Sequence, residues 1–266
     1  MTGVAFVDGE QVEWPGPATI DDPTTVPGAG LFETMRATRG DIPLTSCHLG
    51  RLLTSAEALG LRCPTRATLE GFLQRAVAEI GPSDHRVRLV LVTSGHVVIQ
   101  VAEFEIDDTP IGLSTVIGPV QAEGFAEHKT TAYLPYVQAR QRAEAAGADH
   151  ALIVGPDGSV LEADHASVVA LIDDEWVTPS AEGILPGIAR ALLIERIGVR
   201  PTAIPVADLE RAGAVFVVNA LRGATRVAAL DGRNLPLPGE VLGHIRNALP
   251  ELHRRALDKD RPRRNP

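Results

Sequence analysis

Lysine is almost absent from this sequence, and its scarcity singles out one candidate for amine chemistry. Only two of the 25 lysine and arginine residues are lysine, Lys129 and Lys259. Lys259 lies in the charged, proline-rich run DKDRPRRNP, which we expect to be a frayed tail. A primary amine can attack a carbonyl group and can act as an acid or a base. Lys129 is therefore the one lysine amine that we expect inside the fold.

Two Asp-His dipeptides are the other residues whose types suggest chemistry. Asp149-His150 and Asp164-His165 could each pair a histidine base with a carboxylate that orients it. No candidate nucleophile lies nearby in the sequence, so ordinary strand-edge residues are the favoured interpretation. The eight histidines show no spacing typical of metal ligands, and we expect no metal site.

Searches for common catalytic and nucleotide-binding motifs narrow the possible functions. The sequence contains no G-x-x-x-x-G-K-[ST], G-x-G-x-x-G, G-x-S-x-G or H-E-x-x-H motif. The sequence thus lacks the motifs that usually identify phosphate-loop enzymes, dinucleotide-binding folds, hydrolases with a nucleophile elbow and zincins.

Composition and charge point to small-molecule partners. Hydrophobic residues make up 44% of the chain and charged residues 22%, which is ordinary for a globular protein. A net charge of −9, with the two signs mixed along the chain, argues against nucleic acid and against membrane surfaces as partners. Cys47 and Cys63 are too few for a disulfide framework. The acidic start of the chain does not resemble a signal peptide, so we expect a cytoplasmic protein.

Hydrophobic periodicity predicts a mixed order of helices and strands. The expected helices cover residues 48–61, 66–80, 134–146, 188–197 and 240–249. The expected strands cover residues 4–7, 11–13, 31–37, 42–44, 86–93, 97–104, 151–154, 168–172 and 215–218, with a further one near Val160. This order predicts an N-terminal α+β lobe over 1–117, a linker over 118–124, a C-terminal lobe over 125–257 and a disordered tail over 258–266.

Five segments in order resemble the fold-type IV pyridoxal-phosphate enzymes. This family contains branched-chain aminotransferases, D-amino-acid aminotransferases and 4-amino-4-deoxychorismate lyases. The segments are GLFETMRATRGDIPL with HLGRLLTSAEALGL, HKTTAYLPYVQARQRAEAAGADHALIV, GSVLEADHASV, GILPGIARALL and VFVVNALRGATRV. The resemblance implies two α/β lobes with pyridoxal 5′-phosphate in the cleft between them, the C-terminal lobe binding the cofactor. It also implies a homodimer.

The resemblance assigns cofactor roles to individual residues. Lys129 in HKTTAYL matches the lysine that holds the cofactor as a Schiff base and shuttles protons. Glu162 in VLEAD matches the carboxylate that keeps the pyridine nitrogen protonated. Arg51 in HLGRL matches the phosphate-binding arginine, and Tyr133 the tyrosine that bonds the cofactor's phenolic oxygen.

Backbone groups complete the expected phosphate site, where the sequence also departs from the aminotransferases. Gly187, Ile188 and Ala189 open a helix whose N–H groups can bind phosphate oxygens, and Ala220 is expected to contribute another N–H. Ala189 and Ala220 stand where threonine is usual in the aminotransferases, and the NAL sequence around Ala220 is lyase-like. Ala132 and Ser167 stand where asparagine is common. These departures bear on fine positioning more than on the core chemistry.

Recognition of the substrate carboxylate stays open between two arginines. The family's D-amino-acid branch uses an arginine and a histidine on a loop that shrinks here to residues 94–96, so that site is expected to be missing. Arg36 and Arg88 are the candidate replacements, and Arg36 is favoured because strand alternation places Phe32, Thr34 and Arg36 on one face. Either arginine could instead be a structural ion-pair partner.

Three functions follow from these observations. The favoured one is amino transfer between an amino acid, preferably a D-amino acid, and a 2-oxo acid. The alternative is 4-amino-4-deoxychorismate lyase, which uses the same lysine. A non-catalytic family member that binds pyridoxal phosphate is the third.

Overall fold

The computed structural model describes residues 3–12, 28–78, 80, 83–118, 124–180, 183–236, 244–245 and 248–249. Two compact units contain them. The first unit holds the described residues up to Ile106 together with His128–Ala132, and the second holds those of Asp107–Glu127 and Tyr133–Leu252. The predicted tail lies outside the described residues, as do most of the predicted linker and of the predicted helix 240–249.

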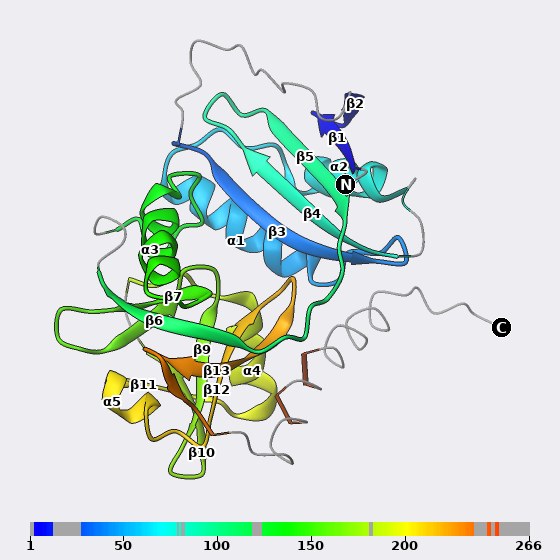
Figure 1. The fold of residues 1–266 in the computed structure, drawn as a ribbon. Helices are drawn as coiled ribbons and strands as arrows, with labels where there is room; N and C mark the ends of the chain where they lie inside the picture. Colours follow the sequence, from blue (N-terminus) through cyan, green and yellow to red (C-terminus); the bar gives the residue numbers. More distant parts are fainter. Residues whose placement is uncertain are drawn as a thin grey trace. The chain divides into compact units, whose positions relative to one another are not determined.

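An antiparallel sheet forms the centre of the first unit (Figure 1), in the order β2-β1-β5-β4-β3 among the described residues. Its strands are β1 (Gly3–Val7), β2 (Glu10–Val12), β3 (Leu31–Thr38), β4 (Asp84–Leu91) and β5 (Val97–Glu103). Residues alternate between the two faces of each strand, as expected for a sheet that packs on one side. One face contributes residues such as Met35 and Leu89 to a core covered by helices α1 (Thr45–Ala58) and α2 (Arg66–Ala78).

A larger sheet builds the second unit, with strand order β11-β10-β9-β12-β13-β6-β7-β8 and β14 paired to β13. Its strands are β6 (Ile111–Ile117), β7 (His150–Val154), β8 (Val160–Ala163), β9 (Ser167–Ile172), β10 (Glu175–Pro179), β11 (Arg200–Thr202), β12 (Ala214–Asn219), β13 (Gly223–Leu230) and β14 (Arg233–Asn234). β8 and β9 are distant in this order, yet a tight turn at 164–165 joins them, with N–H groups of Ala163 and Ala166 bonded to each other's carbonyls. The sheet therefore curls until these strands meet.

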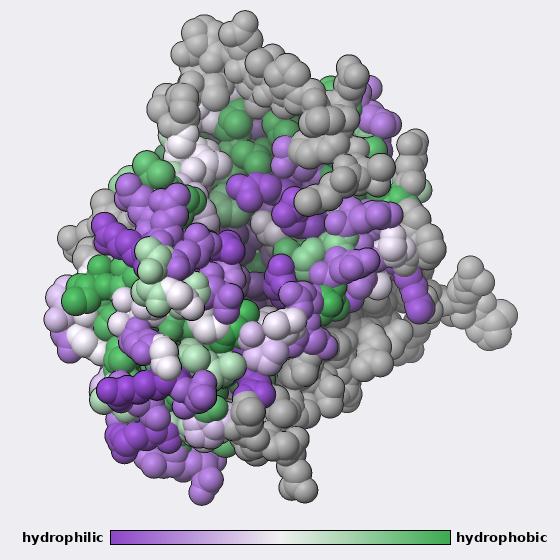
Figure 2. All heavy atoms as spheres, viewed as in Figure 1, coloured by the Kyte–Doolittle hydropathy of each residue, from purple (hydrophilic) through white to green (hydrophobic). Residues whose placement is uncertain are grey.

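Among the residues that the structure describes, the second unit also contains the helices α3 (Leu134–Ala145), α4 (Ile188–Ile197) and α5 (Val206–Leu209). One core contains side chains from most of the strands, among them Leu152, Val168 and Val217, together with Leu209 of α5. Separate clusters pack α4 against β9 and β12, and α3 against β6 and β7. Figure 2 shows that hydrophilic side chains gather over the exposed side of α3.

The structure agrees with many of the predicted elements and differs at several. The predicted hairpin at Asp8-Gly9, the strand near 31–37 and the paired strands 86–93 and 97–104 are present within three residues of the predicted limits. The predicted strand 42–44 is wrong, because Leu44 adopts a left-handed conformation with φ 62° and the chain turns directly into α1. No helix among the described residues is long and apolar enough to cross a membrane.

Candidate active site

The segment that carries Lys129 is bonded to the start of β3. The N–H of Phe32 donates to the carbonyl of Lys129 over 2.8 Å, and the N–H of Thr131 donates to the carbonyl of Gly30 over 2.8 Å. A side chain at Gly30 would place its Cβ 2.5 Å from the carbonyl oxygen of Leu91, so only glycine fits there. Lys129 belongs with His128–Ala132 to the first unit, whereas the sequence-based limits put it in the C-terminal lobe over 125–257.

The ring of Phe32 contacts the two cationic side chains that are most important for the predicted chemistry, Lys129 and Arg88. The Lys129 Nζ lies 4.5 Å from the centre of the Phe32 ring, and the guanidinium carbon of Arg88 lies 4.1 Å from it. Both are within the range of a cation–π interaction. Thr34 pairs with Arg88 across β3 and β4, so the two side chains emerge on the same face of the sheet.

Arg36 lies on the predicted face of β3. Its guanidinium pairs with the Asp84 carboxylate, whereas that of Arg88 lies over the Phe32 ring. As alternation predicts, Met35 and Ala37 enter the core, while Thr34 and Arg36 are only partly buried. A terminal nitrogen of Arg36 lies 2.5 Å from the Asp84 carboxylate. Its Nε is buried without a hydrogen-bond partner among the described residues. Arg36 thus already has a carboxylate partner of its own.

Arg51, in the middle of α1, belongs to a buried ion-pair network. Its Nε and one terminal nitrogen donate to the two oxygens of Glu33 over 2.8 and 2.6 Å. His48, one turn earlier, lies 2.7 Å from the same carboxylate through its Nδ1. Burial alone would raise the pKa of Glu33, but the hydrogen bonds from His48 and Arg51 outweigh burial and lower it to about 2.

The same helix contacts the residue before Lys129. Ser55 is one helical turn beyond Arg51, so α1 presents both residues on its buried side. The Ser55 hydroxyl lies 3.0 Å from Nδ1 of His128. Helix α1 therefore carries Arg51, which Glu33 of β3 orients, and contacts the Lys129 segment through Ser55.

Glu162 lies in the second unit, and a tyrosine that sequence reasoning did not single out holds it. Glu162 is buried on β8, and the Tyr136 hydroxyl donates to its carboxylate over 2.6 Å. The Tyr133 hydroxyl instead donates to the backbone carbonyl of Asp164 over 2.6 Å. The two tyrosine rings stack with centroids 4.8 Å apart. Their spacing of three residues at the start of a helix was the available signal for Tyr136.

The predicted phosphate-binding helix begins where expected. Gly187 is the N-cap of α4, and no side chain caps the helix. The first N–H groups of such a helix can bind an anion. A Cβ on Gly187 would lie 2.4 Å from the Ser167 hydroxyl, so a larger residue there would require this hydroxyl to move. Ser167 pairs with Val218 of β12, and Ala220 follows the end of that strand.

The donor groups that each unit offers fit the chemistry of pyridoxal phosphate. The first unit offers the Lys129 amine for an aldehyde and a preoriented guanidinium at Arg51 for a phosphate. The second offers a buried carboxylate at Glu162 and an uncapped helix start at Gly187. These are the groups that a cofactor with an aldehyde, a pyridine nitrogen and a phosphate needs.

A mixed α/β fold with two sheets, one of them curled, and this donor set define an enzyme of the fold-type IV class. The profile of the family "Amino-transferase class IV" matches residues 30–230. The chain belongs to this family, which confirms the resemblance and the predicted fold class and makes it a member of the pyridoxal-phosphate-dependent class IV transaminases.

Known relatives agree with this assignment. The chain is 29% identical to a "Bifunctional aminodeoxychorismate lyase / D-amino acid transaminase" of Mycobacterium tuberculosis, over 88% of this chain and 93% of the relative. It resembles a solved fold IV-transaminase from Curtobacterium pusillum with a TM-score of 0.82 and 25% identity, over 96% and 99% of the two chains. A hypothetical aminotransferase from M. tuberculosis, solved in a PLP-bound form, gives a TM-score of 0.80 and 27% identity, over 98% and 100%.

Proposed function

We propose that this enzyme transfers amino groups between a D-amino acid and a 2-oxo acid with pyridoxal 5′-phosphate bound to Lys129. Arg51 is the phosphate ligand that we assign in the first unit, and the first turn of α4 with the N–H of Ala220 is the one that we assign in the second. Glu162, held by Tyr136, would be the partner of the ring nitrogen. The observation that carries the proposal is the contact of the Lys129 amine and the Arg88 guanidinium with the same phenylalanine, Phe32.

Lys129 has two tasks in this proposal. It holds the cofactor covalently, and its Nζ then moves a proton from the substrate α-carbon. When bound, the cofactor supplies the conjugated ring that accepts the electron pair left at that carbon. The Glu162 carboxylate keeps the ring nitrogen protonated, and the hydrogen bond from Tyr136 fixes its orientation.

Arg88 is the better placed of the two candidates for the substrate carboxylate. Arg88 and Lys129 share the Phe32 ring, whereas Arg36 is engaged by Asp84 further along β3. A guanidinium next to the reacting amine can hold an α-carboxylate by paired hydrogen bonds and fix the α-carbon near the base. Thr34, opposite Arg88, is positioned to add a hydroxyl contact. The proposal therefore moves the favoured role from Arg36 to Arg88.

The lyase is the second candidate function. Ala220 in place of threonine favours it, and one relative carries both the lyase and the D-amino-acid transaminase names. A non-catalytic binder is the third.

Incubation with D-alanine and 2-oxoglutarate, with L-alanine, and separately with aminodeoxychorismate separates the three. We expect pyruvate from D-alanine only when 2-oxoglutarate is present. Formation of 4-aminobenzoate at a higher rate would instead favour the lyase, and no product from any substrate would favour the binder.

Two further properties belong to the proposal. We infer a homodimer from the resemblance to the fold-type IV enzymes, and such an interface could cover the exposed apolar side chains of Ile117, Phe125, Leu134 and Val137. Light scattering on the purified protein measures this directly, and a monomer at micromolar concentration would contradict it. A cytoplasmic location is the other property, inferred from the sequence.

A further inference from the structure

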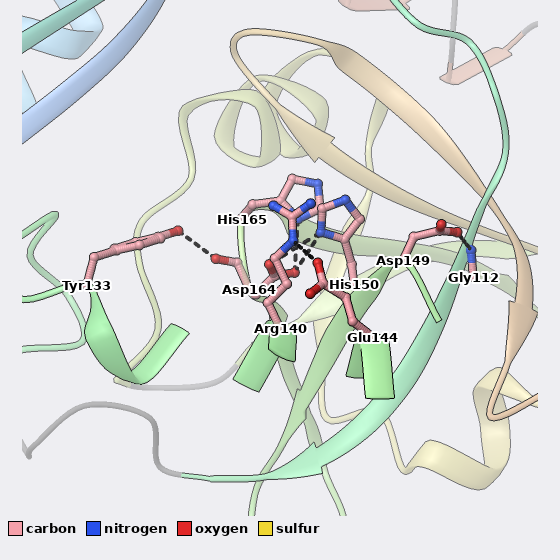
Figure 3. A network of polar contacts seen from close by, with 8 residues as sticks. All are labelled: Gly112, Tyr133, Arg140, Glu144, Asp149, His150, Asp164 and His165. Atoms are coloured by element: carbon pink, nitrogen blue, oxygen red, sulfur yellow. Dashed lines mark hydrogen bonds and ion pairs between the residues drawn. The ribbon is translucent and has the colours of Figure 1, made fainter. Parts of the chain in front are cut away.

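Two Asp-His pairs that are separate in the sequence come together in the second unit. Nδ1 of His150 and Nδ1 of His165 each lie 3.1 Å from the same oxygen of Asp164 (Figure 3). The two imidazole rings stack with centroids 3.8 Å apart. Asp149, the sequence neighbour of His150, instead accepts a hydrogen bond from the Gly112 N–H over 2.7 Å.

Hydrogen bonds to the backbone of Asp164 hold the turn that carries two residues of this cluster. His150 begins β7, and the tight turn between β8 and β9 carries Asp164 and His165. The Asp164 N–H donates to the carbonyl of Ala151, and the Asp164 carbonyl accepts from the Tyr133 hydroxyl. The Asp164 side chain is only 4% exposed. The cluster is thus preformed by the fold.

The spacing of the donor atoms suits a metal ion. One ligand atom from each residue lies within 4.8 Å of the other two. Two ligands bonded to one ion at about 2.0 to 2.1 Å lie roughly 2.9 to 3.4 Å apart when they subtend angles between a right angle and the tetrahedral angle. Both separations between imidazole Nδ1 and the Asp164 oxygen, 3.1 Å, fall in this range.

The cluster also opens onto a pocket. His150 and His165 line a cavity of about 330 Å³, together with the ion pair between Arg140 and Glu144. Carboxylates of Asp107, Glu144 and Asp149 outnumber the guanidiniums of Arg140 and Arg222 in its lining. The positive charge of Arg140 disfavours the binding of a cation next to His165. The carboxylate of Glu144, 3.0 Å from the Nε of Arg140, offsets that positive charge.

We propose that His150, Asp164 and His165 bind one divalent transition-metal ion of the Zn²⁺ type, with at least one position open to the pocket for water. Two imidazoles and one carboxylate are a common ligand set for such ions, and three protein ligands leave a coordination position free. Each histidine binds through Nδ1 and keeps its proton on Nε2. The ion ties the β8–β9 turn to the start of β7.

Zinc retention by the untagged holoenzyme tests the site. The protein is stripped with EDTA, desalted, equilibrated with ZnCl₂ and desalted again, and bound zinc is measured by elemental mass spectrometry. We expect about one zinc ion per chain. His150→Ala and His165→Ala should each weaken binding by more than the roughly 10- to 100-fold that loss of an outer-shell partner costs. Asp164→Asn, which keeps the side-chain shape, should do the same.

Matched controls separate this site from other zinc ligands. Cys47 is an exposed thiol, and His96 is a half-exposed histidine of the first unit, so Cys47→Ser and His96→Ala should bind zinc like the wild type. Added zinc should raise the melting temperature of the wild type and of both controls but not of the three cluster variants. A wild type that retains no zinc would overturn the proposal. So would cluster variants, folded by circular dichroism, that retain zinc as the wild type does.

Discussion

The Glu33 carboxylate accepts two hydrogen bonds from the Arg51 guanidinium, one on each oxygen, over 2.8 and 2.6 Å. The side chain of Glu33 is 1% exposed and that of Arg51 is 12% exposed. This pair fixes the orientation of an arginine that we assign to the cofactor phosphate, so its loss should affect both stability and cofactor binding.

Glu33→Gln should destabilise the protein strongly. In the cofactor-free protein, the substitution removes one partner of a buried ion pair and leaves the Arg51 charge uncompensated, which costs about 3 to 5 kcal/mol in the free energy of unfolding. Urea unfolding measures this loss. Glu175→Gln is the control, because Glu175 pairs with Arg200 on the surface, where such pairs contribute roughly 0 to 1 kcal/mol. Equal losses in the two variants would contradict a structural role for the Glu33 network.

The same carboxylate predicts how stability depends on pH. The pKa of Glu33 is lowered from 4.5 to about 2 in the folded protein, so the folded state favours its ionised form. The resulting stabilisation is fully present above pH 4.5 and is lost as the pH falls from there towards 2. Unfolding free energies measured across this window should fall more steeply for the wild type than for Glu33→Gln. Parallel curves would show that Glu33 does not titrate as described.

Glu162→Gln should leave the cofactor bound while slowing the abstraction of the α-proton by a few orders of magnitude. A neutral amide cannot keep the ring nitrogen protonated, so the ring accepts the electron pair less readily. Tyr136→Phe removes only the hydrogen bond to that carboxylate and should cost much less. Single-turnover rates with a deuterated substrate measure both effects. An unchanged rate in Glu162→Gln would exclude the proposed role.

Arg88→Ala should lower kcat/KM for amino acids selectively. Loss of a guanidinium that binds the α-carboxylate costs about 1.5 to 3 kcal/mol, which is roughly a ten- to hundredfold loss in kcat/KM. Simple primary amines carry no carboxylate and should be affected little. Arg36→Ala is the matched comparison on the same face of the sheet. A selective loss in Arg36→Ala, with Arg88→Ala like the wild type, would return the role to Arg36.

The sequence predicts the individual helices and strands of this fold better than it predicts which strands pair with each other. Alternation in LFETMRAT was sufficient to place Phe32 and Thr34 on the face opposite Met35, because the period of a strand is a local property. The strands β6 and β13 were not predicted. Their parallel pairing with each other joins residues more than a hundred positions apart, which no local pattern encodes.

The candidate site shows the same limit. The resemblance assigned roles to Lys129, Arg51 and Glu162 because they lie in recognisable segments. It did not identify the residues that hold them, since Glu33 and Tyr136 contact Arg51 and Glu162 only through the tertiary structure. His150 is distant in the sequence from Asp164 and His165, so their cluster could likewise not be predicted from local sequence.

The attachment of the cofactor to Lys129 is the central claim, and peptide mapping after borohydride reduction tests it most directly. Reduction in the presence of pyridoxal phosphate should leave the pyridoxyl group on the peptide that contains Lys129. Lys129→Ala should lose both this label and the visible absorbance of the bound cofactor. Lys259→Ala, which removes the only other lysine, should keep both. A label that persists at full level in Lys129→Ala, or that maps to another residue of the wild type, would contradict the assignment.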